Sequence, residues 1–321
     1  MRSIATIASL LLILSLLRFS NLEVKANDSA TFDYEGNYCL SFNGANSSVI
    51  CGYSQIFDLY NLTVEAWIKP QYDIQAGSSA TYGHSGGTIV HHRPSTQDAE
   101  YHGWWIGFSY DDGSLYFSFS YDFDESFNPV AYHTNKATWY NDTWYHIAVT
   151  YDPDLPNWNI KFYVNGTLDS EDNLSSHPIN DYEYSPLQIG IENGVSPYAG
   201  LIDELRIWNY SRTASEIQTT MLRVLDSTEV SNPDLLGYWR LDEGNGTMTD
   251  DYSIQKNDGV LGPNDPTTAP KWYQTGAPII PEFPQLQTMA ALIVISFLTA
   301  TFTQRRTKRI KTNTLRTHAY A

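Results

Sequence analysis

The sequence predicts an all-β protein, an antiparallel β-sandwich formed by one domain of about 250 residues. Short runs of strand-forming residues recur with turn residues between them, and only one clear helix signal interrupts them. Aromatic residues make up 14% of the 321 residues, with 23 Tyr and 9 Trp, and such residues favour β-structure. Hydrophobic residues, at 42%, are enough to fill a core, which excludes a chain that is disordered throughout.

Residues 1–26 are predicted to be a secretory signal peptide. Arg2 precedes an almost unbroken apolar run from Ile4 to Leu17, and Val24-Lys25-Ala26 fits the small-x-small pattern of a cleavage site. An apolar run of about 14 residues is shorter than the roughly 20 that a membrane-spanning helix needs, which disfavours an uncleaved anchor. The folded domain is therefore expected to be exported.

The first predicted strand pair surrounds the Gly44-Ala45-Asn46 turn. Residues 39–42 and 49–51 form a hairpin if positions whose numbers sum to 90 face each other, and Cys39 then lies opposite Cys51. Directly opposed positions are within reach of a disulfide, and an exported protein meets oxidising conditions. The interpretation is a Cys39–Cys51 disulfide, with two separate buried thiols as the alternative.

A second hairpin is predicted from Trp104 to Tyr121, with its turn at Asp112-Gly113, a pair that favours a type I′ turn. Pairing positions whose numbers sum to 225 places Phe108 opposite Phe117 and turns one hydrophobic face toward the core. The other face carries two aromatic residues among small ones, namely Trp105, Gly107, Ser109, Tyr116, Ser118 and Ser120.

Further strands and one helix follow. A third hairpin is predicted from residues 144–151 and residues 160–164, and Asn165-Gly166 turns the chain after the second of these strands. Thr213-Ala214-Ser215-Glu216 is a capping box that opens a helix ending near Val224. The other predicted strands cover residues 187–191, 201–208 and 236–241.

The C-terminal region is predicted to anchor the protein in a membrane. Residues 285–303 carry no charge and are about long enough to cross a hydrocarbon core of roughly 30 Å. The basic residues of the tail, residues 304–321, place this end in the cytoplasm by the positive-inside rule. Residues 278–284 are a proline-rich neck between this single membrane span and the folded domain, which covers residues 27–277.

The segment Ile280-Pro281-Glu282-Phe283-Pro284, just before the span, resembles the Pro-Glu-Phe carboxy-terminal sorting segment of archaeal surface proteins. In that family the motif, a hydrophobic helix and a basic tail are recognised together, which implies cleavage by an archaeosortase. A plain single-pass anchor with a proline-stiffened neck is the alternative interpretation. Both interpretations place the folded domain outside, at the cell surface.

Six blocks occur in order across residues 38–275, namely Leu40–Gly44, Leu62–Pro70, Trp144–Asp152, Phe162–Gly166, Gly200–Trp208 and Leu236–Gly246. Together they resemble the concanavalin A-like, laminin-G-like jelly-roll family that includes the pentraxins. The resemblance implies a two-sheet jelly roll for this domain. The last block is interpreted as closing strands, with a truncated second unit as the alternative. A jelly roll does not by itself imply an activity.

The charge of the exported part narrows the choice of partners. Residues 27–303 hold 10 basic and 35 acidic side chains, a net charge of −25, which excludes nucleic acid as a partner. Eight Asn-x-Ser/Thr sequons predict a glycosylated surface protein. The sequon asparagines are Asn27, Asn46, Asn61, Asn141, Asn165, Asn173, Asn209 and Asn245.

Catalytic motifs are missing from the sequence, so an enzyme is disfavoured. Glycosidases need two carboxylates on either side of the scissile bond, and the Glu-x-Asp-x-Glu spacing of related β-glucanases does not occur. Asp203 and Glu204 are adjacent and are therefore expected on opposite faces of a strand. The same rule separates His91 from His92, which disfavours a zinc site.

Calcium is the metal that the resemblance implies, because pentraxin-like and laminin-G-like relatives bind it through oxygen ligands. Two sites are implied, one from two loops and one where Asp203 approaches the Asn43-Gly44 turn. For Asp203 the alternative is that it accepts backbone hydrogen bonds at the start of a strand. The implied ligands are Asp203, Asn43, Asp98, Glu192 and Asn193.

Trp105 and Tyr116 are the candidate ligand-binding residues, because flat aromatic rings on a sheet can stack on sugar rings. The alternative is that a loop covers them. The first functional hypothesis is a membrane-anchored, non-catalytic recognition module that binds glycans or glycosylated partners with the help of calcium. The second is a structural or adhesion protein of the cell envelope that contacts other envelope proteins. The third is a polysaccharide hydrolase.

Overall fold

The computed structural model describes residues 37–279 except 54, 77–86, 94–102, 110, 124–125, 158, 174–178, 180–184, 193, 195 and 264. The chain divides into two compact units, residues 1–280 and residues 281–321, and the described residues all belong to the first. The predicted signal peptide, membrane span, basic tail and most of the neck lie outside the described residues. In the part of the chain that is described, no helix is long and apolar enough to cross a membrane.

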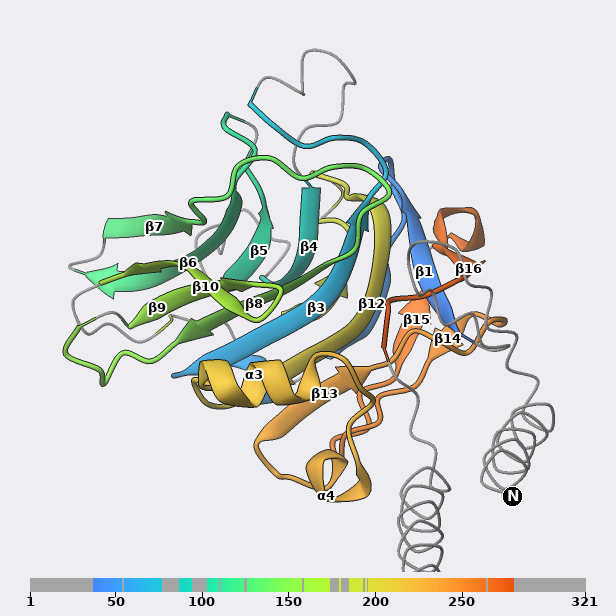
Figure 1. Ribbon diagram of the computed structural model, residues 1–321. Coiled ribbons are helices and arrows are strands. Elements are labelled where there is room, and N and C mark those ends of the chain that lie inside the picture. Colours follow the sequence, from blue (N-terminus) through green and yellow to red (C-terminus); the bar gives the residue numbers. More distant parts are fainter. Residues whose placement is uncertain are drawn as a thin grey trace, which may run out of the picture. The chain divides into compact units, whose positions relative to one another are not determined.

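The described strands form two antiparallel sheets of eight strands each, which pack face to face as a sandwich (Figure 1). Sheet A has the order β10 (Thr167–Asp172), β9 (Ile160–Val164), β8 (Tyr145–Tyr151), β3 (Leu62–Pro70), β12 (Ala199–Trp208), β1 (Tyr38–Asn43) and β16 (Lys271–Gln274), and β13 (Leu235–Trp239) also pairs with β12. Sheet B has the order β14 (Met248–Thr249), β15 (Gly259–Leu261), β2 (Val49–Tyr53), β11 (Pro186–Ile189), β4 (Gly87–His92), β5 (Trp104–Phe108), β6 (Leu115–Phe123) and β7 (Ser126–His133). The predicted all-β, antiparallel sandwich is therefore confirmed.

The main hydrophobic core lies between the two sheets, and alternation along each strand supplies it. On β5, Trp104, Ile106 and Phe108 enter the core while the residues between them face outward. Phe119 of the neighbouring strand packs against Tyr151 of sheet A with ring centroids 4.9 Å apart, which joins the two sheets. Burial of each such large apolar side chain contributes about 1.5–3 kcal/mol to folding.

The hairpin predicted between residues 104 and 121 is present, but its register differs from the prediction by two residues. Phe108 lies opposite Leu115, and Ile106 lies opposite Phe117. The turn is longer than the predicted two-residue type, because the ladder closes where Ser109 donates to Ser114. A shift of two residues leaves every side chain on the same face of the sheet, so the predicted assignment of side chains to the two faces is confirmed.

The third hairpin and the helix start also match the prediction, since β8 pairs with β9 from Ile147–Val164 to Tyr151–Ile160. Asn165 (φ 50°) and Gly166 (φ 71°) turn the chain between β9 and β10, as a type I′ turn requires. Thr213 and Glu216 form both hydrogen bonds of the predicted capping box at the start of α3 (Ala214–Thr220). Helix α3 ends earlier than predicted.

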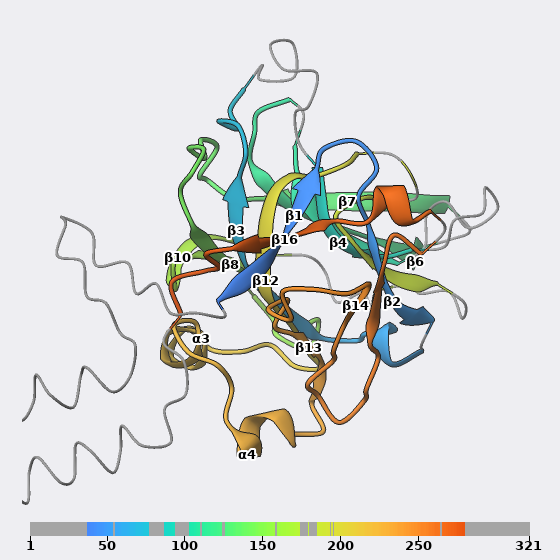
Figure 2. The ribbon, with the colours of Figure 1, turned by 90° about the vertical axis from the view of Figure 1, so that its right-hand side faces the viewer.

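Figures 1 and 2 show α3, α4 (Ser227–Val230) and β13 on the same side of the sandwich. Val224 and Leu225, between the two helices, form a second buried cluster with Trp208 and Leu235 on the outer side of sheet A. Two 3₁₀ turns, Gln55–Phe57 and Pro266–Thr268, complete the described helical elements.

The first predicted hairpin and its disulfide are wrong. β1 pairs with β12 and β16 in sheet A (Figure 2), whereas β2 pairs with β11 and β15 in sheet B. The loop between them crosses from one sheet to the other, and Asn43 Oδ1 accepts three backbone N–H hydrogen bonds within it. Cys39 and Cys51 are consequently free and buried, which is the alternative left open by the sequence.

The free thiols give a direct prediction for chemical labelling. Burial raises the pKa of both Cys39 and Cys51, so the reactive thiolate is scarce and a reagent has no access. Iodoacetamide should leave the native protein unlabelled and add two groups after unfolding without reductant, as measured by mass spectrometry. An unfolded, unreduced protein that takes up no label would contradict this and restore the disulfide.

Candidate functional site

One row of side chains crosses the outer face of sheet B. Trp105 of β5 lies opposite His91 of β4 and Ser118 of β6, and Gln188 of β11 lies on the far side of His91. Their strand neighbours, such as Trp104 and Phe117, enter the core, so this row faces away from it. Trp105 therefore lies on the outer face of sheet B, away from the core, as the sequence predicted.

Trp105 and Tyr116 form a contact pair on this face. The indole Nε1–H of Trp105 donates to the hydroxyl of Tyr116 at 3.0 Å, and the ring centroids are 6.5 Å apart at an interplanar angle of 82°. Both side chains are half-buried, so each keeps part of its ring accessible. The exposed His133 lies beside Tyr116, with ring centroids 6.1 Å apart. The predicted aromatic pair is thus brought together with a polar neighbour.

A salt bridge that sequence reasoning missed covers part of this pair. The guanidinium carbon of Arg93 lies 4.3 Å from the ring centroid of Trp105, and the group is hydrogen-bonded to Glu192. Burial raises the pKa of Glu192, and Arg93 opposes that shift. One signal was visible in the sequence, because Arg93 is the only lysine or arginine between Lys69 and Lys136. Sequence alone could not show which ring it would meet.

His91 and His92 point to opposite faces, as predicted for adjacent residues on a strand. His91 is fully buried on the outer face, where its Nε2 lies 3.0 Å from Gln188 Oε1. Burial lowers the pKa of His91 to about 4, although the Gln188 contact works against the shift. The Nε2 atom of His92 instead lies 3.0 Å from the carbonyl oxygen of Ser185.

Asp203 and Asn43, which the resemblance implied as ligands of one calcium site, lie apart in the structure. Asp203 accepts backbone hydrogen bonds from Glu204 at 3.0 Å and from Ala277 at 2.7 Å, which is the alternative that the sequence left open. Asn43 pairs with Ala199, four residues from Asp203 along β12, a separation of about 13 Å. In the described part of the chain, no three acidic, His or Cys side chains gather as metal ligands do. Asp98 and Asn193 lie outside the described residues.

Asp203 and Glu204 lie on the same face of sheet A, so the prediction that they face apart is wrong. Their neighbours Ile202 and Leu205 both enter the core. A β-bulge in β12 places two residues, instead of one, on the outer face between Ile202 and Leu205, with Glu204 at φ 51°. The carboxylate of Glu204 accepts hydrogen bonds from Arg206 and from the hydroxyl of Tyr238, both at 2.6 Å.

This bulge belongs to a buried charge network on the outer face of sheet A, which the sequence did not reveal. Glu65 is fully buried and accepts hydrogen bonds from Trp208 Nε1 at 3.0 Å and from Arg212. Burial alone would raise the pKa of Glu65, but Arg212, His146 and Arg206 together hold it well below its usual range. His146 is buried with its Nε2 3.5 Å from Glu65 Oε2.

Comparisons with known proteins identify the family to which this fold belongs. Residues 43–218 match a family model, Laminin_G_3, described as the concanavalin A-like lectin/glucanases superfamily. A search of curated proteins found no match.

Among solved structures, a candidate carbohydrate binding protein from Bacteroides ovatus is 18% identical, with a TM-score of 0.55 over 77% of this chain and 62% of that chain. A heptameric SAP-like pentraxin from Limulus polyphemus is 17% identical, with a TM-score of 0.39 over 57% of this chain and 81% of that chain. The CBM40 domain of the Ruminococcus gnavus IT-sialidase, bound to α2,3-sialyllactose, is 13% identical, with a TM-score of 0.39 over 51% of this chain and 84% of that chain.

The likeness to the Bacteroides ovatus protein is one of fold, and this chain covers less than two thirds of that protein's length. The family model, by contrast, spans more than half of the 321 residues. The protein therefore belongs to the concanavalin A-like lectin/glucanases superfamily, as the resemblance of its sequence blocks implied.

Proposed function

We propose that this protein is a non-catalytic carbohydrate-binding module displayed at the cell surface. The observation that carries the proposal is the half-buried pair of Trp105 and Tyr116 on the outer face of sheet B. The C–H groups of a sugar ring pack well against such aromatic surfaces. The family description names lectins and glucanases, so a sugar is the first class of ligand to test.

Polar groups around the aromatic pair supply the hydrogen bonds that a sugar needs. Arg93 and Glu192 meet above Trp105, and His133 borders Tyr116. Because the guanidinium group covers one face of the indole, the sugar is expected to pack against Tyr116 and the edge of Trp105. Arg93, Glu192 and His133 would then bind hydroxyl groups at the edge of the ring.

Burial of the carboxylates supports binding rather than cleavage. A glycosidase needs two carboxyl groups that flank a reachable glycosidic bond. Glu65, Asp203 and Glu204 are at most 2% exposed, so no polysaccharide can pass between them. Glu192, beside the aromatic pair, is held by Arg93.

The sequons and the membrane span predicted near the C-terminus support display of the domain on the outside of a cell. Seven of the eight sequon asparagines lie in the described residues, and none of the seven is buried. Surface asparagines of this kind are open to glycosylation in an exported protein. The membrane span predicted at residues 285–303, with or without the sorting step, would then hold the module at the surface.

A glycan array tests the function. The wild-type protein should bind one group of glycans, and Trp105→Ala should weaken that binding at least about tenfold, because one of the two rings of the aromatic pair is removed. Tyr273→Ala is the matched control, since Tyr273 is an aromatic residue 48% exposed on the edge strand of sheet A.

Each array should be repeated with a chelator, because calcium dependence is an expectation of the family resemblance. Binding that is equal in Trp105→Ala and wild type would disprove the role of this face. A wild-type protein that binds no glycan but retains envelope proteins would favour the adhesion hypothesis.

A further inference from the structure

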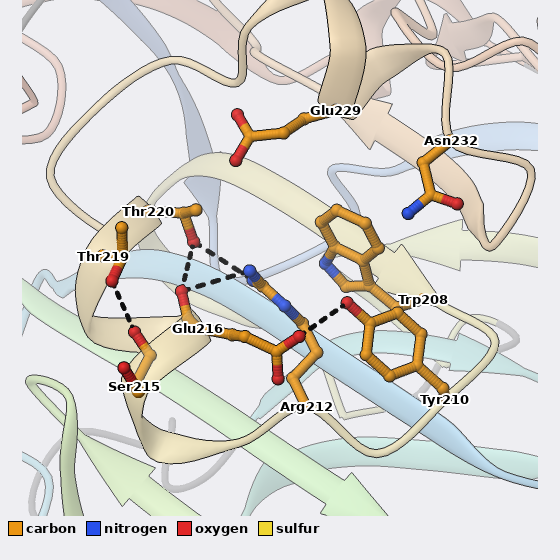
Figure 3. A pocket seen from close by; sticks show the side chains of 9 residues that line it. All are labelled: Trp208, Tyr210, Arg212, Ser215, Glu216, Thr219, Thr220, Glu229 and Asn232. Atoms are coloured by element: carbon orange, nitrogen blue, oxygen red, sulfur yellow. Dashed lines mark hydrogen bonds between the residues drawn. The ribbon is translucent and has the colours of Figure 1, made fainter.

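A pocket of about 240 Å³ opens on the outer side of sheet A, where α3 and the turn after α4 meet the end of β12. Figure 3 shows its lining, which consists of Trp208, Tyr210, Arg212, Ser215, Glu216, Thr219, Thr220, Glu229 and Asn232. Trp105 and Tyr116 lie on the outer face of the other sheet. The pocket is therefore separate from the site proposed above.

The floor of the pocket contains a buried arginine. Arg212 is 4% exposed, and its guanidinium carbon lies 4.4 Å from the ring centroid of Trp208. Its terminal nitrogens donate to Glu65, to Thr220 Oγ1 at 3.1 Å and to the carbonyl oxygen of Glu216 at 3.1 Å. These hydrogen bonds hold the guanidinium group in place at the floor of the pocket.

The charged side chains around the pocket already have ion-pair or hydrogen-bond partners, which favours an uncharged ligand. Arg212 is neutralised by Glu65 beneath it. Glu229 is hydrogen-bonded by both terminal nitrogens of Arg223 at 2.7 Å. Glu216 accepts hydrogen bonds from the backbone and hydroxyl groups of Thr213. A charged ligand would have to compete with these pairs, whereas a neutral ligand would not.

The walls combine aromatic surface with groups that suit hydroxyls. Tyr210 is half-buried and meets Trp208 edge to face, with ring centroids 5.8 Å apart and an interplanar angle of 77°. Asn232 Oδ1 accepts from the backbone of Asp234 at 3.0 Å, and Figure 3 shows the amide nitrogen of Asn232 directed toward the pocket. Glu229 and Ser215 line the same space. Donors, acceptors and an apolar wall together match a polyhydroxylated ring.

We propose that this pocket binds one neutral sugar ring, so that the domain holds two sugar sites on the outer faces of opposite sheets. Its volume is below the roughly 300–1,000 Å³ of pockets that hold drug-sized ligands, which favours a single ring over a chain. Two sites on opposite faces would let one molecule join two glycans. This inference shares a ligand class with the proposed function but depends on none of its residues.

The test uses indole N–H signals in two-dimensional NMR spectra of the full-length protein in detergent, titrated with glucose, galactose, mannose and N-acetylglucosamine. Trp208 reports on the pocket and Trp105 on the other face, and each signal is assigned by its loss on substitution with Phe. At least one sugar should shift the Trp208 signal. Asn232→Asp keeps the acceptor for Asp234 but removes the donor, and it should weaken binding about tenfold.

Two more variants complete the test. Ser215→Trp places a large side chain in the pocket and should abolish the Trp208 shift. Thr228→Ala, an exposed position on α4 that does not line the pocket, should titrate like the wild type. The inference is overturned if no sugar moves the Trp208 signal, or if Asn232→Asp and Ser215→Trp titrate like the wild type. A shift confined to Trp105 would support the proposed function and reject the pocket.

Discussion

Replacing Glu65 with Ala should lower the free energy of unfolding by about 3–5 kcal/mol, because it leaves the buried positive charges of Arg206 and Arg212 without this carboxylate. Arg206 and Arg212 are 1% and 4% exposed, and Glu65 is the acid that Arg212 contacts. Trp208 would also lose the acceptor of its indole N–H. A typical domain is stable by only about 5–15 kcal/mol, so the loss would be a large part of the total.

Urea unfolding followed by tryptophan fluorescence measures this effect. Glu171→Ala is the matched control, since Glu171 is an exposed glutamate on β10 opposite Lys161, and it should cost less than about 1 kcal/mol. Glu65→Gln keeps the shape of the side chain but not its charge, and should fall between the two. A loss below about 1 kcal/mol in Glu65→Ala would show that the network does not depend on this carboxylate.

Acid should destabilise the protein through His91. Burial lowers its pKa to about 4 in the folded protein, against about 6.5 in an unfolded chain. Between these values the unfolded state binds a proton that the folded state does not, so stability falls as the pH falls. The slope is about 1.4 kcal/mol per pH unit, and the total reaches roughly 3 kcal/mol near pH 4.

His91→Gln isolates this contribution, because glutamine can still donate to Gln188 but does not titrate. Unfolding free energies at pH 7 and pH 4.5 should therefore differ less in the variant than in the wild type, by about 2–3 kcal/mol. Other groups titrate in the same range, and burial raises the pKa of Asp203 and Glu204, which acts in the opposite direction. They are common to both proteins and cancel in the comparison. Parallel pH profiles would contradict the assignment to His91.

Local sequence patterns predicted much of the fold. The capping box at Thr213 and the Asn165-Gly166 turn involve contacts within a few residues, and both are present. Alternation placed Trp105 and Tyr116 on the outer face even though the hairpin register differed by two residues. A pattern of period two tolerates such a shift, because it returns each side chain to its own face.

Sequence did not predict the partners of β1 and β2 or the buried charges. A short turn beside two strands suggested a hairpin, but β1 pairs instead with β12 and β16, which are more than 150 residues away along the chain. The charge network likewise joins Glu65 to Arg212, 147 residues apart. Long-range pairing depends on the burial of whole sheet faces, which no local window contains.

The sequence by itself determined the sandwich, the Asn165-Gly166 turn and the two faces of β5 and β6, because these follow from neighbouring residues. The tertiary structure alone decided that the cysteines lie in different sheets and that a bulge puts Asp203 and Glu204 on one face. It also decided that Arg93 covers Trp105. These features depend on which distant segments meet, and that choice is made by packing in three dimensions.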